Sequence, residues 1–321
     1  MIRPYELSLG LPVKLDKDEL ANTSQLWDIL VASHEGDLDA VKKLVDECPP
    51  LIYGQYNYTP PIHFAVREGH VDLVRYLLDN GAHDPAYKTY PFNESLSTVA
   101  ADRGFDEIVE MLADYVAHPE RQKFAGDNGG IEYGHSDETI EFQQSITKAD
   151  HAHVASMLDK DPQLVDNPLL FWGEGVLCRS SNDPEPEMVE LLVSRGARVP
   201  KMSKWGREYY FKHFPIAKYL MEHGMDADHT TWHHVTMLHN QAQLGNIEKA
   251  ELLLDHGAKI DPIEEEYSST PLGMAARWGH VEMVKFLLDR GADPTKAAAP
   301  WATPAAWATR KGHTEIDRLL L

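Results

Sequence analysis

Histidine side chains gather in the second half of the sequence, where they could form a site for a transition metal. Imidazole nitrogens are common metal ligands, and several must converge on one ion. The cluster comprises His213, His223, His229, His233, His234 and His239. We expect His229, His233 and His234 to lie on one short loop, where adjacent side chains point to opposite faces. Because such rings do not converge, we predict no metal site and no cofactor.

One acidic residue has surroundings that would suit a general acid or base. Glu174 lies between two glycines and close to Phe171, Trp172 and Arg179. Aromatic walls exclude water and can raise the pKa of a carboxyl group toward neutrality. Loop carboxylates are more often solvated, however, and strongly shifted pKa values are uncommon. We therefore favour a solvated loop residue here, and also for the run Glu264–Glu266.

The elements that carry these residues recur with a regular period. Glycines fall in two series with spacings of 33 to 35 residues: Gly36, Gly69 and Gly104, then Gly245, Gly279 and Gly312. Pairs of leucines and Thr-Pro dipeptides recur in step with them. A period in this range indicates stacked repeats, each of which is one supersecondary unit.

The clearest repeat predicts two short helices. Thr270 can cap a helix N-terminus and Pro271 suits the first helical position, which needs no N–H. Leu272, Ala275 and Ala276 follow at helical spacing and form an apolar stripe whose small alanines allow close approach of a neighbouring helix. A glycine then permits a left-handed stop before the second helix. Neither helix can bury its apolar face alone, so the copies must stack.

This repeat is similar to the ankyrin repeat at its Thr-Pro-Leu, Ala-Ala, Gly-His and Leu-Leu positions and in its closing Gly-Ala-Asp. The resemblance implies an all-α ankyrin-repeat solenoid of about nine helix–turn–helix units with short β-hairpin loops. The central units, four to six, are degenerate, and the sixth is short enough to need either a shortened hairpin or a truncated helix. We expect residues 1–21 to be an N-terminal extension, 22–321 to be one ankyrin repeat domain, and 116–139 to be a loop inserted between repeats.

The resemblance also suggests where a partner would bind. In ankyrin repeats the hairpin tips and the outward residues at the end of the first helix line a concave binding face. Here those positions are rich in aromatic residues and arginine, which commonly anchor interfaces. The predicted binding residues are Trp172, Tyr210, Trp232, His233, Tyr267, Arg277, Trp278 and Trp301. We expect the four tryptophans to be exposed on the groove, Trp307 to pack between helices, and His239 to hydrogen-bond within the repeat scaffold.

Composition limits the partners. The chain has 30 Lys and Arg residues against 51 Asp and Glu residues, a formal net charge of −21. This charge repels phosphate backbones, so we do not expect nucleic acid binding. No stretch approaches the roughly 20 apolar residues of a membrane span, and no apolar signal segment follows the first residues. We therefore expect no membrane association, a cytoplasmic location, and a protein partner with a neutral or basic surface.

Two classes of function fit these observations. The first is a non-catalytic scaffold that mediates protein–protein interaction through an aromatic- and Arg-rich concave groove. The second is an enzyme or a small-molecule binder, in which the degenerate repeats and the inserted loop enclose an aromatic, His and Glu pocket for a carbohydrate or another polar ring compound. We favour the scaffold on the resemblance, which speaks for the fold more than for the site, and leave enzymatic activity open.

Overall fold

The chain divides into two compact units. The computed structural model describes residues 1–15, 20–123, 129–183, 185–204 and 207–320. The N-terminal unit comprises Tyr5–Gly134, and the C-terminal unit comprises His135–Leu321 together with Met1–Pro4. The boundary near Gly134 falls inside the predicted inserted loop, so the predicted domain of residues 22–321 extends over both units.

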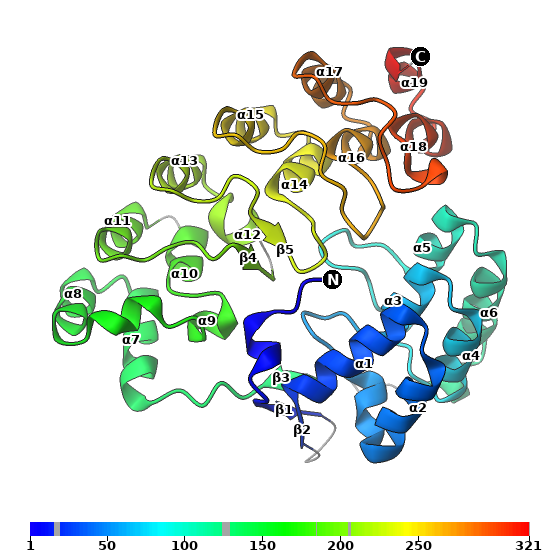
Figure 1. The fold of residues 1–321 in the computed structure, drawn as a ribbon, viewed down its shortest axis with the longest axis horizontal. Helices are drawn as coiled ribbons and strands as arrows, with labels where there is room; N and C mark the ends of the chain where they lie inside the picture. Colours follow the sequence, from blue (N-terminus) through cyan, green and yellow to red (C-terminus); the bar gives the residue numbers. More distant parts are fainter. Residues whose placement is uncertain (16–19, 124–128, 184, 205–206, 321) are drawn as a thin grey trace. The chain divides into compact units, whose positions relative to one another are not determined.

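The N-terminal unit contains three helix pairs (Figure 1). They are α1 (Thr23–Glu35) with α2 (Leu38–Glu47), α3 (Pro61–Glu68) with α4 (Val71–Asp79), and α5 (Leu96–Arg103) with α6 (Asp106–Ala117). Short 3-10 helices lie at Tyr5–Ser8, Pro49–Tyr53 and Pro119–Arg121. Strand β1 (Pro12–Lys14) pairs antiparallel with both β2 (Leu20–Asn22) and β3 (Gly130–Ile131). The sequence did not predict this small sheet, which joins the N-terminal extension to the end of the inserted loop.

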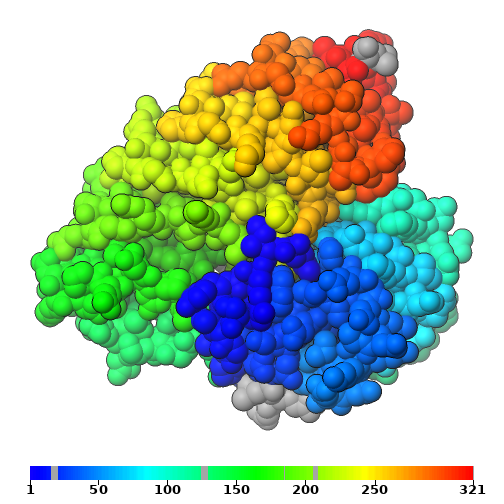
Figure 2. Space-filling model, viewed as in Figure 1, coloured from blue at the N-terminus to red at the C-terminus, as the bar shows by residue number. Residues whose placement is uncertain are grey.

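The C-terminal unit continues the repeats (Figure 1). Its atoms from His135 onward are coloured green to red in the space-filling view (Figure 2). Its helix pairs are α7 (Asp137–Thr147) with α8 (His151–Lys160), α10 (Leu177–Asn182) with α11 (Pro186–Ser194), α12 (Arg207–Tyr210) with α13 (Phe214–Glu222), α14 (Met237–Leu244) with α15 (Ile247–Asp255), α16 (Pro271–Trp278) with α17 (Val281–Asp289), and α18 (Pro304–Lys311) with α19 (Thr314–Leu320). Further elements are α9 (Leu170–Gly173), 3-10 helices at Pro162–Asp166 and Pro300–Ala302, and the parallel strands β4 (Met202–Ser203) and β5 (Thr230–Thr231).

The predicted all-α solenoid is confirmed. The described residues form nine helix pairs, and the first helix of the sixth repeat, α12, comprises Arg207–Tyr210 among them. Among the described helices, none combines the length and the apolar character needed to cross a membrane.

Threonine caps and small side chains position the first helices. The side chain of Thr270 accepts a hydrogen bond from the N–H of Gly273 at 3.3 Å, and Thr303 does the same for Ala306 at 3.2 Å. Ala275 lies fully buried in α16, which packs between α14 and α18. The first helices therefore form the core of each stack, and the second helices cover it.

A hydrogen bond joins the end of each of several first helices to the next repeat. The last carbonyls of a helix have no partner within the helix and carry its negative dipole end, so they favour a donor from outside. The ring Nε2 of a histidine at the start of the next second helix supplies it: His70 to the His34 oxygen (2.9 Å), His213 to Asn182 (3.0 Å), His280 to Gln243 (2.7 Å) and His313 to Arg277 (3.1 Å). In the seventh repeat Lys249 donates instead, to the oxygens of Phe211 and Lys212. We call these contacts the repeat joints.

At three of the repeat joints the ring passes over a glycine, whereas at the His213 joint Asp183 follows the acceptor Asn182. Gly279 has φ +78°, and a Cβ built there would lie 2.6 Å from His313 Cε1. Gly36 and Gly245 stand in the same relation to His70 and His280. Gly312 has φ +77°, but no other heavy atom would lie within 4 Å of its Cβ.

This pair of glycines allows a direct test. Both Gly279→Ala and Gly312→Ala bear the left-handed backbone cost, roughly 1–2 kcal/mol. Only Gly279→Ala also pushes a ring away from its carbonyl partner. We expect its free energy of unfolding to fall by at least about 1 kcal/mol more than that of Gly312→Ala, measured by urea unfolding followed by circular dichroism. Equal losses would show that the ring contact adds no stability.

Candidate functional site

The hairpin tips of the last four repeats are linked by their backbones. Met202 pairs with Thr230 between β4 and β5. The N–H of Glu265 donates to the His233 oxygen at 3.1 Å, and the N–H of Ala298 donates to the Ser268 oxygen at 2.9 Å. We call the tips of repeats seven and eight, residues 231–234 and 264–267, the hairpin surface.

A buried carboxylate organises the tip of the eighth repeat. Glu264 is 1% exposed and accepts the N–H groups of Glu266 (2.6 Å), Tyr267 (2.9 Å) and Ser269 (3.2 Å). Burial, together with the nearby Glu266 carboxylate, raises the pKa of Glu264 to about 8, and the three N–H groups act in the opposite direction. The prediction that Glu264–Glu266 is a solvated run is therefore wrong, because the tight turn needs an acceptor inside it.

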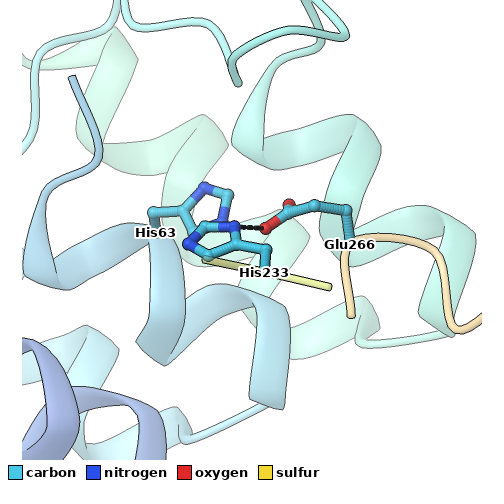
Figure 3. Close-up of side chains that lie close together, drawn as sticks. All are labelled: His63, His233 and Glu266. Atoms are coloured by element: carbon cyan, nitrogen blue, oxygen red, sulfur yellow. Dashed lines mark hydrogen bonds and ion pairs between the residues drawn. The ribbon is translucent and has the colours of Figure 1, made fainter. Parts of the chain in front are cut away.

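Beside this turn, an aromatic residue and a histidine stack on the preceding tip. The rings of Trp232 and His233 have centroids 3.9 Å apart, and Trp232 is 2% exposed. His233 Nδ1 forms a hydrogen bond with Glu266 Oε1 (Figure 3). His63, drawn in the same figure, belongs to the N-terminal unit, where its Nδ1 meets the Tyr87 hydroxyl at 3.1 Å. The expected exposure of Trp232 and His233 is wrong, because both side chains are buried in the tip.

The loop histidines of the C-terminal unit have separate partners. His229 Nδ1 donates to the Pro200 oxygen at 2.6 Å, and its Nε2 accepts from the Ser203 hydroxyl at 2.9 Å. His234 Nε2 lies 3.4 Å from the Glu265 carboxylate. His229, His233 and His234 thus point to different groups, as the opposite-face argument predicted. The absence of a metal site stays a prediction.

An arginine is sandwiched among aromatic rings at the end of α16. The Arg277 guanidinium carbon lies 4.5 Å from the ring centre of Tyr267, 5.0 Å from that of Trp278 and 4.4 Å from that of Trp307. Trp301 packs edge-on against Trp307, with centroids 5.7 Å apart. Cations over aromatic faces at such distances are attracted by the ring quadrupoles. We call these five residues the arginine stack.

The arginine stack contains both buried and half-buried side chains. Tyr267 and Arg277 are buried, so the expectation that they face outward is wrong, whereas Trp278 and Trp301 are half-buried. Trp307 is fully buried and donates from Nε1 to the Ser269 hydroxyl at 2.8 Å, which confirms its predicted packing role. His239 donates from Nε2 to the Ser269 oxygen at 3.1 Å, and so serves the scaffold as predicted.

The degenerate fifth repeat holds one tryptophan outward. Trp172 is 52% exposed, as expected, on a left-handed backbone with φ 61°. Its carbonyl accepts Lys204 Nζ at 2.5 Å. Tyr210 is buried instead, and its hydroxyl donates to the Glu174 carbonyl at 3.0 Å. The outward expectation for Tyr210 is wrong, because the shortened sixth repeat turns this ring into the core.

Glu174 is also not a solvated loop residue. Its side chain is 1% exposed, and Oε1 accepts the N–H of Lys204 at 2.7 Å. This bond ties the loop after α9 to the start of the sixth repeat. The sequence gave no signal for Lys204 as the partner, because the two residues are 30 positions apart.

Comparison with known proteins now decides the family. A family model described as ankyrin repeats, in three copies, matches residues 29–123 and 207–298, more than half of the chain. The chain belongs to the ankyrin-repeat family. Its ankyrin repeats support a role as a protein–protein interaction scaffold. The segment between the two matched ranges contains the degenerate fourth and fifth repeats.

Similar ankyrin sequences occur in much longer proteins. The chain is 39% identical to the mouse palmitoyltransferase ZDHHC13 over 128 residues, which cover 39% of this chain and 20% of that protein. It is 22% identical to human transient receptor potential cation channel subfamily A member 1 over 347 residues, 90% of this chain and 26% of the channel. With mouse ARF GTPase-activating protein GIT2 the identity is 33% over 84 residues, 26% of this chain and 12% of that protein. The chain thus spans only about a quarter or less of each of these relatives.

The N-terminal ankyrin repeats carry a pocket of about 310 Å³. It lies between the hairpin tip at Tyr58 and the loop that contains Tyr87 and Tyr90, and Gln55 and Asp84 also line it. Phenol, amide and carboxylate groups of this kind can hydrogen-bond a polar ring compound. The sequence placed such a pocket at the degenerate repeats instead.

Two buried histidines of the ankyrin scaffold make stability depend on pH. Burial lowers the pKa of His229 and that of His239 to about 4, while their carbonyl partners act in the opposite direction. The unfolded chain, with histidine pKa values near 6.5, binds more protons between these limits, so each ring costs stability as pH falls from 6.5 to 4. Glu264 has the opposite sign, because its raised pKa makes the folded state bind more protons between pH 4.5 and 8.

A histidine variant separates these contributions. We expect the free energy of unfolding of His239→Asn to fall less between pH 7 and pH 5 than that of the wild type, by roughly 1–2 kcal/mol. Urea unfolding at both pH values measures this. The exposed His256→Asn is the matched control and should keep the wild-type difference. The same pH difference in wild type and His239→Asn would contradict the assignment.

Proposed function

We propose that this ankyrin-repeat chain binds its protein partner through the hairpin tips and first-helix ends of the C-terminal unit. The arginine stack carries the proposal. Its buried members, Tyr267, Arg277 and Trp307, hold the half-buried Trp278 and Trp301 in fixed positions. Aromatic residues held in place before binding lose little conformational entropy, so more of the contact energy reaches the affinity.

Charge supports a neutral or basic partner surface. The chain carries a net charge of −21, and long-range attraction would favour partners of opposite sign. Trp172, on the degenerate fifth repeat, offers a second exposed anchor for such a partner. A cytoplasmic location, and the absence of nucleic acid as a ligand, are part of the same proposal and rest on composition.

The alternative, a catalytic pocket at the degenerate repeats, receives less support. It depends on Glu174 as a proton donor or acceptor. The carboxylate is 1% exposed and engaged by the Lys204 N–H, so it is suited to holding the loop. We therefore do not propose a reaction at this position.

Truncation of a half-buried anchor tests the proposed surface. Removing an aromatic anchor commonly costs about 2 kcal/mol of binding. Trp278→Ala should therefore weaken partner capture from cell extract, quantified by mass spectrometry and then titration, by more than about tenfold. Trp172→Ala tests the second anchor in the same way.

The control lies on the outer helix α17. Glu282 and Lys285 form an exposed ion pair there, with Nζ and Oε1 2.7 Å apart. Exchanging the two, as Glu282→Lys with Lys285→Glu, keeps the net charge and should leave capture unchanged. If the exchange abolishes capture while Trp278→Ala and Trp172→Ala bind normally, the working surface is the outer face.

A further inference from the structure

We propose that the hairpin surface of repeats seven and eight is a binding site for an extended peptide that presents a cationic group next to an apolar residue. The chain's own residues Met1–Pro4 occupy this site. The inference rests on the proposed function, a protein-binding C-terminal unit, and names the chemistry of one segment that such a partner would offer.

Two contacts define how the segment is held. The amino group of Met1 lies 2.6 Å from Glu265 Oε1. The N–H of the next residue, Ile2, donates to the Trp232 oxygen at 2.9 Å. One ion pair and one backbone hydrogen bond from adjacent residues are the elements by which extended peptides are recognised: the backbone bond fixes register, and the charge supplies selectivity.

The acceptors are fixed by their own repeats. Glu265 sits in the turn that the buried Glu264 carboxylate holds through three N–H groups, and its own N–H is bound to the His233 oxygen. The Trp232 ring is 2% exposed and lies in tilted contact with the His233 ring, with centroids 3.9 Å apart. The hairpin surface is therefore ordered by contacts that do not involve Met1–Pro4.

The segment is local to the C-terminal unit although it lies far away in sequence. Residues Met1–Pro4 group with His135–Leu321 by their contacts, while the chain from Tyr5 to Gly134 forms the other unit. The contacts of Met1 and Ile2 described above are one ion pair and one backbone hydrogen bond, both of which a partner segment can reproduce. Because the advantage of Met1–Pro4 is intramolecular effective concentration, a partner segment of the same chemistry at sufficient concentration can replace it.

The Glu265 carboxylate at the hairpin surface also favours a cationic partner group. Glu265 is partly exposed and has His234 Nε2 at 3.4 Å as its neighbour. An acidic group in this position selects an ammonium or guanidinium group over an acidic or neutral one. The partner segment that would replace Met1–Pro4 at this site is therefore a basic extended peptide. This agrees with a basic partner surface for a chain of net charge −21.

A labelled copy of the chain's own N-terminal sequence is the probe. The peptide Met-Ile-Arg-Pro-Tyr-Glu, with a free amino group and a fluorophore at its C-terminal end, is titrated with full-length protein and followed by fluorescence anisotropy. In the wild type the site is occupied. In Ile2→Pro the chain lacks the N–H that donates to the Trp232 oxygen, so we expect the probe to bind this variant at least tenfold more tightly than the wild type.

Two further comparisons test the chemistry of the site. Adding Glu265→Gln to Ile2→Pro should weaken probe binding at least tenfold, and acetylating the probe's amino group should do the same. Glu248→Gln, on the exposed start of α15, removes the same charge elsewhere and should have no effect. Equal probe binding by wild type and Ile2→Pro, or no effect of Glu265→Gln and acetylation, would overturn the inference.

The result is separable from the proposed function. Loss of partner capture in Trp278→Ala, together with no probe binding to any variant, would leave the scaffold role in place and reject only the peptide site. Thermal melting of each variant checks that the fold is retained, so a binding loss with an unchanged melting temperature reports on the surface.

Discussion

One recurring hydrogen bond, the repeat joint between the end of a first helix and a donor on the next repeat, links several of the stacked repeats. An unsatisfied buried carbonyl costs about 1–3 kcal/mol, and a bond to a cation contributes more than one to a neutral ring. In the eighth and ninth repeats the ring passes directly over Gly279, which fixes the spacing of the helices. The small alanines of the core can then meet, because the joint has already set how close the helices lie.

At the hairpin tips and loops, buried glutamate side chains hold the backbone in place by accepting hydrogen bonds. Glu264 collects three N–H groups within its own turn, Glu174 binds the N–H of Lys204, and in the N-terminal unit Glu6 accepts the Tyr56 hydroxyl at 2.7 Å. Burying a carboxylate is expensive unless donors surround it, so each of these turns has one geometry that satisfies the charge. Exposed residues in the same turns, such as Glu265, are therefore also held in one backbone position.

The repeat pattern was readable in sequence because it depends on backbone rules. A cap at Thr270, a left-handed stop at Gly279 and the buried pair Ala275 and Ala276 all follow from local geometry. The sheet of β1, β2 and β3 was not readable, because its strands are two or three residues long and β3 pairs with β1 across more than 100 positions.

The candidate site was predicted in part. Position in the repeat correctly placed Trp172 outward, whereas Trp278 and Trp301, which were predicted to be exposed, are half-buried. It could not tell that Trp232 and Arg277 are buried, because their burial depends on which neighbour's ring or tip covers them. A run of acidic residues in a sequence also gives no indication that one of them is buried. Glu264 was therefore predicted to be solvated, whereas the structure buries it inside its turn.

The chemistry of the repeat joint has a consequence for how repeats are counted. The joint needs a donor of suitable reach: His213 supplies it in the degenerate sixth repeat, and Lys249 supplies it in the seventh repeat in place of a histidine. The same bond can therefore be made by a different side chain, so a fixed residue pattern can miss a joint that the structure keeps. The match breaks off after residue 123 and resumes at 207, yet helix pairs fill much of that interval. In a chain built this way, the repeats that a family model recognises are a lower bound on the repeats that stack.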